Sequence, residues 1–195
     1  TEAAVDDRED QVVYRAGVRR VPRLTRASAL PLPDDDRLAS DGAHLVVGAT
    51  GNIGPHLIRQ LSSMGAGTVV AVSRNPGDRL DEVITELAAQ GTTVIPIAAD
   101  ATDRDDMAAL FARFGAELPR LDGVYLAAFG GGPVTLTDMS DDDVSAMFRP
   151  KLDALAVLHD MTVSTGVDRF VVFSSISGLT GSRWLSHYAA TTTFL

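Results

Sequence analysis

Short apolar segments alternate with amphipathic segments along the chain from His44 onward. The apolar segments are rich in valine, isoleucine and alanine, which is typical of strands buried on both faces of a parallel sheet. The segments between them repeat apolar residues at helical spacing. We predict strands at His44–Gly48, Thr68–Ser73, Thr93–Ala98, Gly123–Ala128 and Arg169–Ser174, and helices at Ile53–Met64, Asp78–Gln90, Asp103–Phe114 and Ser140–Thr165. This order predicts an α/β fold, a doubly wound parallel sheet with helices on both faces.

Residues at the ends of the helices support these limits. Asp78 can cap the second helix, and Gly91 can end it. Ser140 precedes three aspartates, which place a hydrogen-bond acceptor and negative charge at the start of the fourth helix. Gly166 is expected to end that helix. The segment around Tyr188 is expected to begin a further helix.

The N-terminal part follows a different pattern. Apolar and basic residues alternate over Gln11–Leu24 on either side of Ala16-Gly17, as in a β-hairpin or a paired edge strand. The Ser-, Pro- and Asp-rich stretch Ala27–Asp36 is typical of a linker. We therefore expect a separate segment at 1–38 and one domain at 39–195.

Composition narrows the classes of function. The chain has 195 residues, a net charge of −9 and no cysteine, which predicts no disulfide framework and repulsion of nucleic acid. No apolar run approaches the roughly 20 residues of a membrane span. Glu2, Asp6 and Asp7 lie where a signal peptide would be basic or apolar. These features predict a soluble cytoplasmic protein without membrane insertion. The histidines show no ligand spacing, so we predict no metal site.

A glycine-rich turn, Gly48–Gly54 (GATGNIG), joins the first predicted strand to the first predicted helix. Glycines at this spacing allow a tight turn and a close approach of backbone N–H groups to a pyrophosphate, which the helix dipole also favours. A glycine-rich turn alone is weak evidence, but its place directly after the first strand of the sheet is specific. We predict a nucleotide-binding site at this turn.

The next two strands end in residues that suit a phosphorylated dinucleotide. The second strand ends at Ser73 and is followed by Arg74, where an arginine suits the 2′-phosphate of NADP and an acidic residue would suit NAD. Asp100 follows the third strand and is placed to accept a hydrogen bond from an adenine amine. A surface charge at Arg74 and a simple helix-start acid at Asp100 are the alternatives. NADPH is the predicted cofactor.

A serine, a tyrosine and the only lysine of the chain are candidates for carbonyl reduction. Ser175 lies at the carboxyl end of the fifth strand, where open α/β folds bind their ligands, and Tyr188 follows it. Lys151 lies in the preceding helix and can point at the same edge. A cation beside a phenol stabilises the ionised phenol. Taken singly, the three residues could equally be a strand-end hydroxyl, a packed aromatic and a solvated helix charge.

Together these residues resemble the ketoreductase domains of modular polyketide synthases, a branch of the short-chain dehydrogenase/reductase superfamily. Ordinary short-chain dehydrogenases and extended sugar-nucleotide epimerases carry lysine four residues after the tyrosine, where this chain has Thr192. Polyketide ketoreductases carry it on the earlier helix, where Lys151 stands. The matching segments are Val12–Leu24, Gly48–Gly54, Ser73-Arg74, Asp100, Arg149-Pro150-Lys151, Phe173-Ser174-Ser175 and Tyr188-Ala189-Ala190.

The resemblance implies a Rossmann-type fold in a C-terminally incomplete, NADPH-binding domain at 39–195, with the end of a truncated structural subdomain at 1–38. It implies reduction of a β-ketoacyl thioester on an acyl carrier protein, among neighbouring synthase domains, during polyketide or lipid chain extension. Tyr188 would donate the proton, Ser175 would hydrogen-bond the substrate oxygen, and Lys151 would support the tyrosine. The implied cofactor-binding residues are Gly48, Thr50, Gly51, Asn52, Ile53, Gly54, Ser73, Arg74, Asp100, Ala101, Ala127, Ala128, Lys151 and Tyr188.

The chain also departs from this family. Thr192 stands where the family has the asparagine of its catalytic set, and threonine cannot offer an amide donor and acceptor together. Phe129–Pro133 (FGGGP) replaces the Leu-Asp-Asp signature of one alcohol configuration, and its first residue replaces a glycine beside the nicotinamide. The tryptophan of the other configuration is Thr180 here, whereas Trp184 lies closer to the tyrosine, at the substrate mouth or over the core.

Three functions therefore stay open. The first is the NADPH-dependent reductase. The second is a reductase-silent or epimerising module that keeps the fold. The third is a free-standing extended reductase or epimerase, which Thr192 and the N-terminal hairpin disfavour.

Overall fold

A computed structural model describes residues 9–26 and 37–195, and the chain divides into two compact units, Thr1–Asp35 and Asp36–Leu195. The first unit contains an antiparallel hairpin of β1 (Val13–Arg15) and β2 (Val18–Arg20). Ala16 and Gly17 between these strands both have positive φ, at 49° and 76°, as a tight hairpin turn requires. The predicted hairpin is confirmed. The predicted linker Ala27–Asp36 lies outside the described residues.

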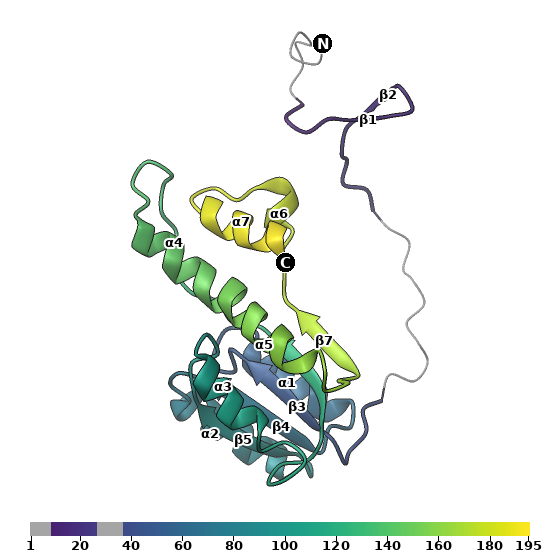
Figure 1. The fold of residues 1–195 in the computed structure, drawn as a ribbon, viewed down its shortest axis with the longest axis vertical. Helices are drawn as coiled ribbons and strands as arrows, with labels where there is room; N and C mark the ends of the chain where they lie inside the picture. Colours follow the sequence, from purple (N-terminus) through teal and green to yellow (C-terminus); the bar gives the residue numbers. More distant parts are fainter. Residues whose placement is uncertain (1–8, 27–36) are drawn as a thin grey trace. The chain divides into compact units, whose positions relative to one another are not determined.

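The second unit is built on a five-stranded parallel sheet with the strand order β5-β4-β3-β6-β7 (Figure 1). The first strand of this unit, β3, lies in the middle of the sheet, and every residue in it is buried. The chain therefore winds outward to one edge and then to the other, as in a Rossmann-type fold. The strands are β3 (Ala43–Val47), β4 (Thr68–Ser73), β5 (Thr93–Ala98), β6 (Leu121–Leu126) and β7 (Arg169–Val172).

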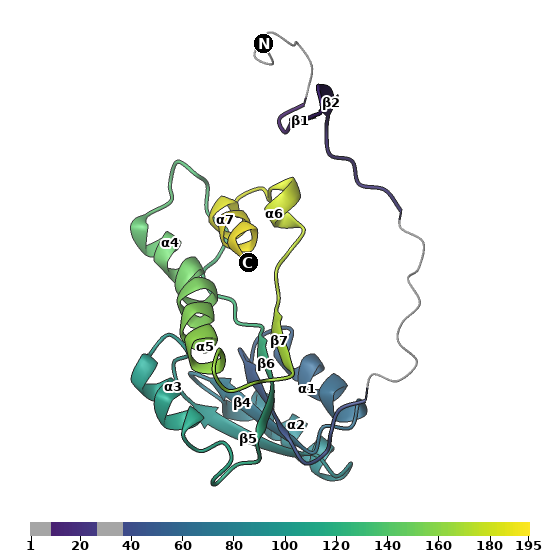
Figure 2. The ribbon, with the colours of Figure 1, turned by 45° about the vertical axis from the view of Figure 1, so that its right-hand side comes forward.

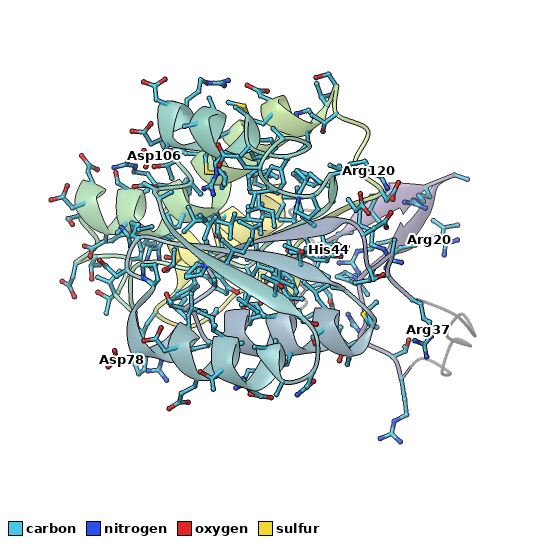
Figure 3. The ribbon with its side chains drawn as sticks, turned by 90° about the horizontal axis from the view of Figure 1, so that it is seen from below. Arg20, Arg37, His44, Asp78, Asp106 and Arg120 are labelled. Carbon is cyan, nitrogen blue, oxygen red and sulfur yellow. The ribbon has the colours of Figure 1, made fainter. Side chains whose placement is uncertain are left out.

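Helices cover both faces of this sheet, as Figure 3 shows, with Asp78 in one outer layer and Asp106 in the other. Leu45 and Val47 pack into the core on one face of the sheet. Val46, between them, packs into the core on the other face. The predicted α/β class and doubly wound sheet are confirmed. The helices of the two layers are α1 (Gly54–Ser63) and α2 (Gly77–Ala88) on one face, and α3 (Arg104–Phe111) and α5 (Ala154–Thr162) on the other.

The helix ends agree with the sequence at Ser140 but not at Asp78. Ser140 and Asp143 form a reciprocal capping box at the start of α4 (Asp141–Phe148). The predicted Asp78 cap is wrong, because α2 begins at Gly77 with Pro76 before it and has no side-chain cap. Asp78 lies inside the first turn, where its negative charge still favours the positive end of the helix dipole.

The long helix predicted at 140–165 is interrupted by a π-helical turn, η2 (Arg149–Asp153), between α4 and α5. Pro150 has no backbone N–H and therefore cannot continue the α-helical hydrogen bonds. In their place the Ala154 N–H donates to the Arg149 carbonyl, five residues earlier, which is the hydrogen bond of a π-helix. A π turn holds one residue more than an α turn, so it changes which side chains face the sheet. Lys151, at the centre of this turn, is buried.

After β7 the chain forms two short helices, α6 (Ser177–Thr180) and α7 (Ser186–Phe194), and α7 packs beside α4 (Figures 1 and 2). β7 ends at Val172, two residues before the predicted Ser174. The helix predicted around Tyr188 is α7. Within residues 9–26 and 37–195, no helix has the length and apolar character to cross a bilayer.

The amino-terminal end of the sheet encloses a histidine. His44 on β3 is 2% exposed, and its ring lies 5.9 Å from the ring of Tyr125 on β6. Gly123 makes room for the imidazole, because a Cβ there would lie 2.6 Å from Nδ1 of His44. Burial lowers the pKa of His44, and this effect outweighs the nearby Asp122 carboxylate. The folded protein therefore holds this imidazole in its neutral form.

This burial makes the stability of the fold depend on pH. An unfolded histidine takes up its proton near pH 6.5, whereas folded His44 resists protonation, so stability is lost as pH falls below about 6.5. We expect the melting temperature to fall between pH 7.5 and pH 5.5 by less in His44→Leu than in the wild-type protein. His56→Leu, at an exposed position on α1, is the matched control. An equal fall in the His44→Leu and wild-type proteins would contradict this expectation.

Candidate active site

A cleft of about 420 Å³ lies at the carboxyl ends of β3, β4, β5 and β6. The strand order reverses beside β3, and open α/β sheets bind ligands at such a point. The cleft is closed on one side by α4 and the π turn, through Ser145, Ala146, Arg149 and Pro150. The predicted cofactor residues that line it are Gly48, Thr50, Gly51, Ser73, Arg74, Asp100, Ala101 and Ala128.

The other predicted residues lie around this cleft rather than in its wall. Asn52 lines a smaller hollow between α1 and α2, and Ile53 immediately precedes α1 at the surface. Ala127 is buried, and its N–H donates to the Val47 carbonyl of the central strand. The remaining members of the predicted set are Gly54, Lys151 and Tyr188.

Glycine is required at both ends of the turn between β3 and α1. Gly48 has a φ of 87°, and a Cβ there would lie 2.6 Å from the backbone of Ala128. A Cβ on Gly54 would lie 2.2 Å from the Ala49 carbonyl oxygen, so only glycine lets α1 start this close to the strand. No side chain caps α1. Apart from Pro55, which has no N–H, the first backbone N–H groups of α1 therefore have no side-chain acceptor and can bind an anion.

Polar side chains link the segment after β5 to the π turn. The Asp100 carboxylate accepts hydrogen bonds from the backbone N–H and the hydroxyl of Thr102, at 2.9 and 2.8 Å. Arg149 donates to the same hydroxyl at 3.1 Å. Burial raises the pKa of Asp100, but these two hydrogen bonds, with the charges of Arg74 and Arg149, lower it overall. Asp100 is thus held as a carboxylate.

Two arginines in this region were not predicted as site residues. Arg149 lines the cleft two residues before Lys151, and its neighbourhood in the Arg-Pro-Lys motif was the one available signal. Arg79 on α2 donates to the Thr50 carbonyl of the glycine turn at 2.8 Å. No local pattern indicates that contact, because the two residues are 29 positions apart.

The structure brings Lys151 and Tyr188 together. Lys151 is 4% exposed, and its ammonium lies 5.5 Å from the centre of the Tyr188 ring. The same ammonium donates to the Phe173 carbonyl, just beyond β7, at 3.0 Å. Burial lowers the pKa of Lys151. The interpretation of Lys151 as a solvated helix charge is therefore wrong, because its side chain points inward under the tyrosine.

Ser175 lies between β7 and α6, and its hydroxyl is engaged within that segment. It donates to the Ser177 hydroxyl and accepts from the Ser177 N–H, both at 3.1 Å. Since a hydroxyl has a single proton, Ser175 must turn that proton away from Ser177 before it can donate to another group. The structure places Ser175 at the expected edge of the sheet, with its hydroxyl directed to its own loop.

Thr192 is buried on α7 and does not reproduce the chemistry of an asparagine. Its hydroxyl lies 3.1 Å from the Tyr188 carbonyl and 3.0 Å from the Ala189 carbonyl, so its proton is directed into its own helix. Its carbonyl accepts a hydrogen bond from the Ser174 hydroxyl at 2.8 Å. Thr192 thus links α7 to the end of β7.

Trp184 is exposed rather than packed over the core. Its φ is 62°, which is unusual for a residue other than glycine, and Arg183 stacks on its ring at 4.6 Å. The Trp184 carbonyl accepts from the Val134 N–H at 2.8 Å, which ties the loop after β6 to the loop before α7. The interpretation that the Trp184 side chain covers the core is therefore wrong.

Comparison with known proteins identifies the family. The KR domain model matches residues 42–195. The chain belongs to the ketoreductase (KR) domain family. A phenolphthiocerol/phthiocerol polyketide synthase protein from Mycobacterium bovis is 60% identical over 195 residues, which are 100% of this chain and 12% of that protein. The corresponding protein of Mycobacterium tuberculosis is also 60% identical, so this KR domain spans about an eighth of the curated relatives it matches.

Solved structures agree with this assignment. An A1-type ketoreductase matches with a TM-score of 0.82 and 33% identity, covering 96% of this chain and 40% of that one. The first ketoreductase of the tylosin polyketide synthase matches with a TM-score of 0.79 and 30% identity, covering 97% and 41%. A short-chain dehydrogenase/reductase from Mycobacterium ulcerans matches with a TM-score of 0.70 and 26% identity, covering 80% and 58%. The KR domain thus belongs to the short-chain dehydrogenase/reductase superfamily.

The KR fold implies a nicotinamide cofactor, and the residues of this cleft fit one. Gly48 and Gly54 leave no space for a Cβ, which keeps the turn between β3 and α1 tight, and the start of α1, which no side chain caps, favours the charge of a pyrophosphate. Arg74 and Asp100 line the same cleft as this turn. Cationic, anionic and backbone donor groups, which a dinucleotide requires, therefore line one cleft.

The contacts of Thr192 lead to a prediction about its hydroxyl. Thr192→Val removes a group that bonds only to carbonyls of its own helix, so we expect kcat for carbonyl reduction to change by less than about twofold. Steady-state kinetics of the full-length protein measures this. A loss of tenfold or more would show that the hydroxyl takes part in the proton relay instead.

Proposed function

We propose that this KR domain reduces a β-ketoacyl thioester to the β-hydroxyacyl thioester with NADPH. The observation that carries the proposal is the buried Lys151 ammonium beneath the Tyr188 ring, next to a cleft that fits a dinucleotide. A cation, a phenol and a nucleotide site at one edge of a sheet are the requirements for reducing a carbonyl group.

The proposed cofactor site uses the turn and the strand ends described above. The glycine turn and α1 bind the pyrophosphate, Asp100 and Ala101 bind the adenine, and Arg74 binds the 2′-phosphate. Ala127 and Ala128 follow β6 beside the nicotinamide. This assignment also includes Asn52 and Ile53, whose backbone N–H groups lie at the start of α1.

In the proposed reaction the cofactor supplies a hydride to the β-carbon. Tyr188 donates its phenolic proton to the carbonyl oxygen as negative charge develops there. Lys151 holds positive charge beside the phenol. One of the three N–H groups of its ammonium donates to the Phe173 carbonyl, so the others can contact the nicotinamide ribose. Ser175 turns its proton from Ser177 to the substrate oxygen and so orients the carbonyl group.

The substrate is proposed to arrive on an acyl carrier protein, within a larger synthase. The relatives that share 60% identity with the whole chain are polyketide synthase proteins, which supports neighbouring synthase domains as partners. In this proposal residues 39–195 carry the reductase chemistry during polyketide or lipid chain extension. Residues 1–38, which include the β1–β2 hairpin, are the end of a structural subdomain.

The competing function is a module that binds the nucleotide without reducing a ketone, or that only epimerises the α-carbon. Thr192 favours it, because the group that replaces the family asparagine directs its hydroxyl proton into its own helix. The presence of the Lys151–Tyr188 pair favours the reductase.

The first test is turnover that depends on Tyr188. Full-length protein with NADPH and a β-ketoacyl thioester should consume NADPH, measured as loss of nicotinamide absorbance. Tyr188→Phe should lower kcat by about 100-fold or more, because it removes a general acid but little volume, and should keep NADPH binding. Measured NADPH binding without Tyr188-dependent turnover would favour the non-reducing module.

The second test is the choice of cofactor. Arg74→Ala should raise the Kd of NADPH by about tenfold or more and leave that of NADH nearly unchanged, since a hydrogen bond to a charged group contributes about 1.5–3 kcal/mol. Arg113→Ala, in the turn after α3 and paired with Glu117 outside the cleft, is the matched control. Equal effects on the two cofactors would exclude the phosphate-binding assignment of Arg74.

A further inference from the structure

Besides Lys151, the Tyr188 ring has an aromatic neighbour, which the mechanism above does not use. Phe129 follows β6 and lines the cleft, yet it is 55% exposed. Its ring meets that of Tyr188 nearly perpendicularly, with 5.4 Å between centroids and 71° between planes. This is the edge-to-face arrangement that aromatic pairs prefer.

The backbone beside Phe129 is fixed by close packing against α4 and the π turn. A Cβ on Gly130 would lie 2.4 Å from the Ala146 carbonyl oxygen and 3.0 Å from the ring of Pro150. Because Pro150 has no N–H, the Ala146 carbonyl does not receive the usual helical hydrogen bond. The backbone at Gly130 can therefore pass close to this carbonyl. Gly130 therefore sets the place from which the Phe129 side chain reaches Tyr188.

Tyr188 is consequently contacted from two separate elements. The π turn supplies the Lys151 ammonium, and the segment after β6 supplies the Phe129 ring. The loop that continues from Phe129 is also tied to the loop before α7, through the Val134 N–H and the Trp184 carbonyl. Both contacts restrict the phenol, whose orientation must suit proton transfer to the carbonyl oxygen.

We propose that Phe129 is a positioning residue, which holds the Tyr188 phenol in the orientation needed for proton donation. The proposal rests on the reductase function proposed above. Loss of the ring would let the phenol sample orientations in which it cannot donate its proton. Although Phe129 also lines the cleft, its ring packs against Tyr188, so its loss should lower kcat by a larger factor than it changes nucleotide binding.

The test compares two exposed phenylalanines in the full-length protein. Phe129→Leu should lower kcat about three- to tenfold, the range of an aromatic pair, with less than a twofold change in the Kd of NADPH measured by fluorescence. Phe129→Tyr, which keeps the ring, should retain kcat within about twofold. Phe194→Leu, which removes an exposed ring elsewhere on α7, should change neither value. Unchanged kcat in Phe129→Leu, or an effect confined to NADPH binding, would overturn the proposal.

A measurement without turnover separates this proposal from the proposed function. Tetranitromethane nitrates accessible tyrosine rings, and the peptide that contains Tyr188 can be followed by mass spectrometry. Phe129→Leu should speed nitration of Tyr188 by about threefold or more, whereas Phe194→Leu should not. If wild-type protein shows no turnover but this difference appears, the reductase function fails and the contact with Tyr188 stands. If Tyr188 is nitrated at the same rate in all three proteins, Phe129 does not hold the phenol.

Discussion

The buried ammonium group of Lys151 joins the elements on which the candidate site depends. Lys151 lies in the π turn, its ammonium donates to the Phe173 carbonyl just beyond β7, and the Tyr188 ring that it faces belongs to α7. A buried cation is costly unless polar groups satisfy it, so these three elements must meet at defined positions for the charge to be tolerated. The same requirement explains why the π turn matters. The extra residue of the π turn rotates the following side chains about the helix axis, at the point where the Lys151 side chain must face the protein interior.

Close backbone packing sets the geometry of the rest of the cleft. Gly48 and Gly54 let strand, turn and helix approach within distances that any side chain would prevent, and Gly130 does the same between the β6 segment and α4. These approaches leave backbone donors at the glycine turn and the Phe129–Tyr188 ring pair beside α4 and the π turn. The polar chain of Asp100, Thr102 and Arg149 runs between the two regions. The Lys151–Tyr188 pair thus lies beside the cleft, and Phe129, which lines the cleft, contacts the Tyr188 ring.

Much of the architecture could be predicted from local sequence. The strand at Thr68–Ser73 was placed with its observed bounds because a run of small and β-branched apolar residues suits a strand buried on both faces. The Ser140 cap and the hairpin turn at Ala16-Gly17 also follow from short motifs. The prediction that Asp78 caps α2 is wrong, because the helix begins one residue earlier, at Gly77, with Pro76 before it. The prediction of one continuous α-helix over 140–165 is wrong, because Pro150 interrupts the α-helical hydrogen bonds and a π turn joins α4 to α5.

The sequence by itself determined which elements form, where the glycine turn lies, and that one lysine is available for the site. Periodicity, turn residues and composition act over a few neighbouring positions, so they can be recognised in the chain alone. Only the tertiary structure decided that Lys151 is buried beneath Tyr188, that Ser175 bonds to its own loop, and that Phe129 meets the tyrosine ring. The partners of Lys151 and Phe129 are brought together by packing between elements distant in sequence, the Phe173 acceptor lying 22 positions from Lys151. Ser175 is different, because its partner is nearby and the direction of a single hydroxyl proton depends on the loop geometry that the finished fold imposes.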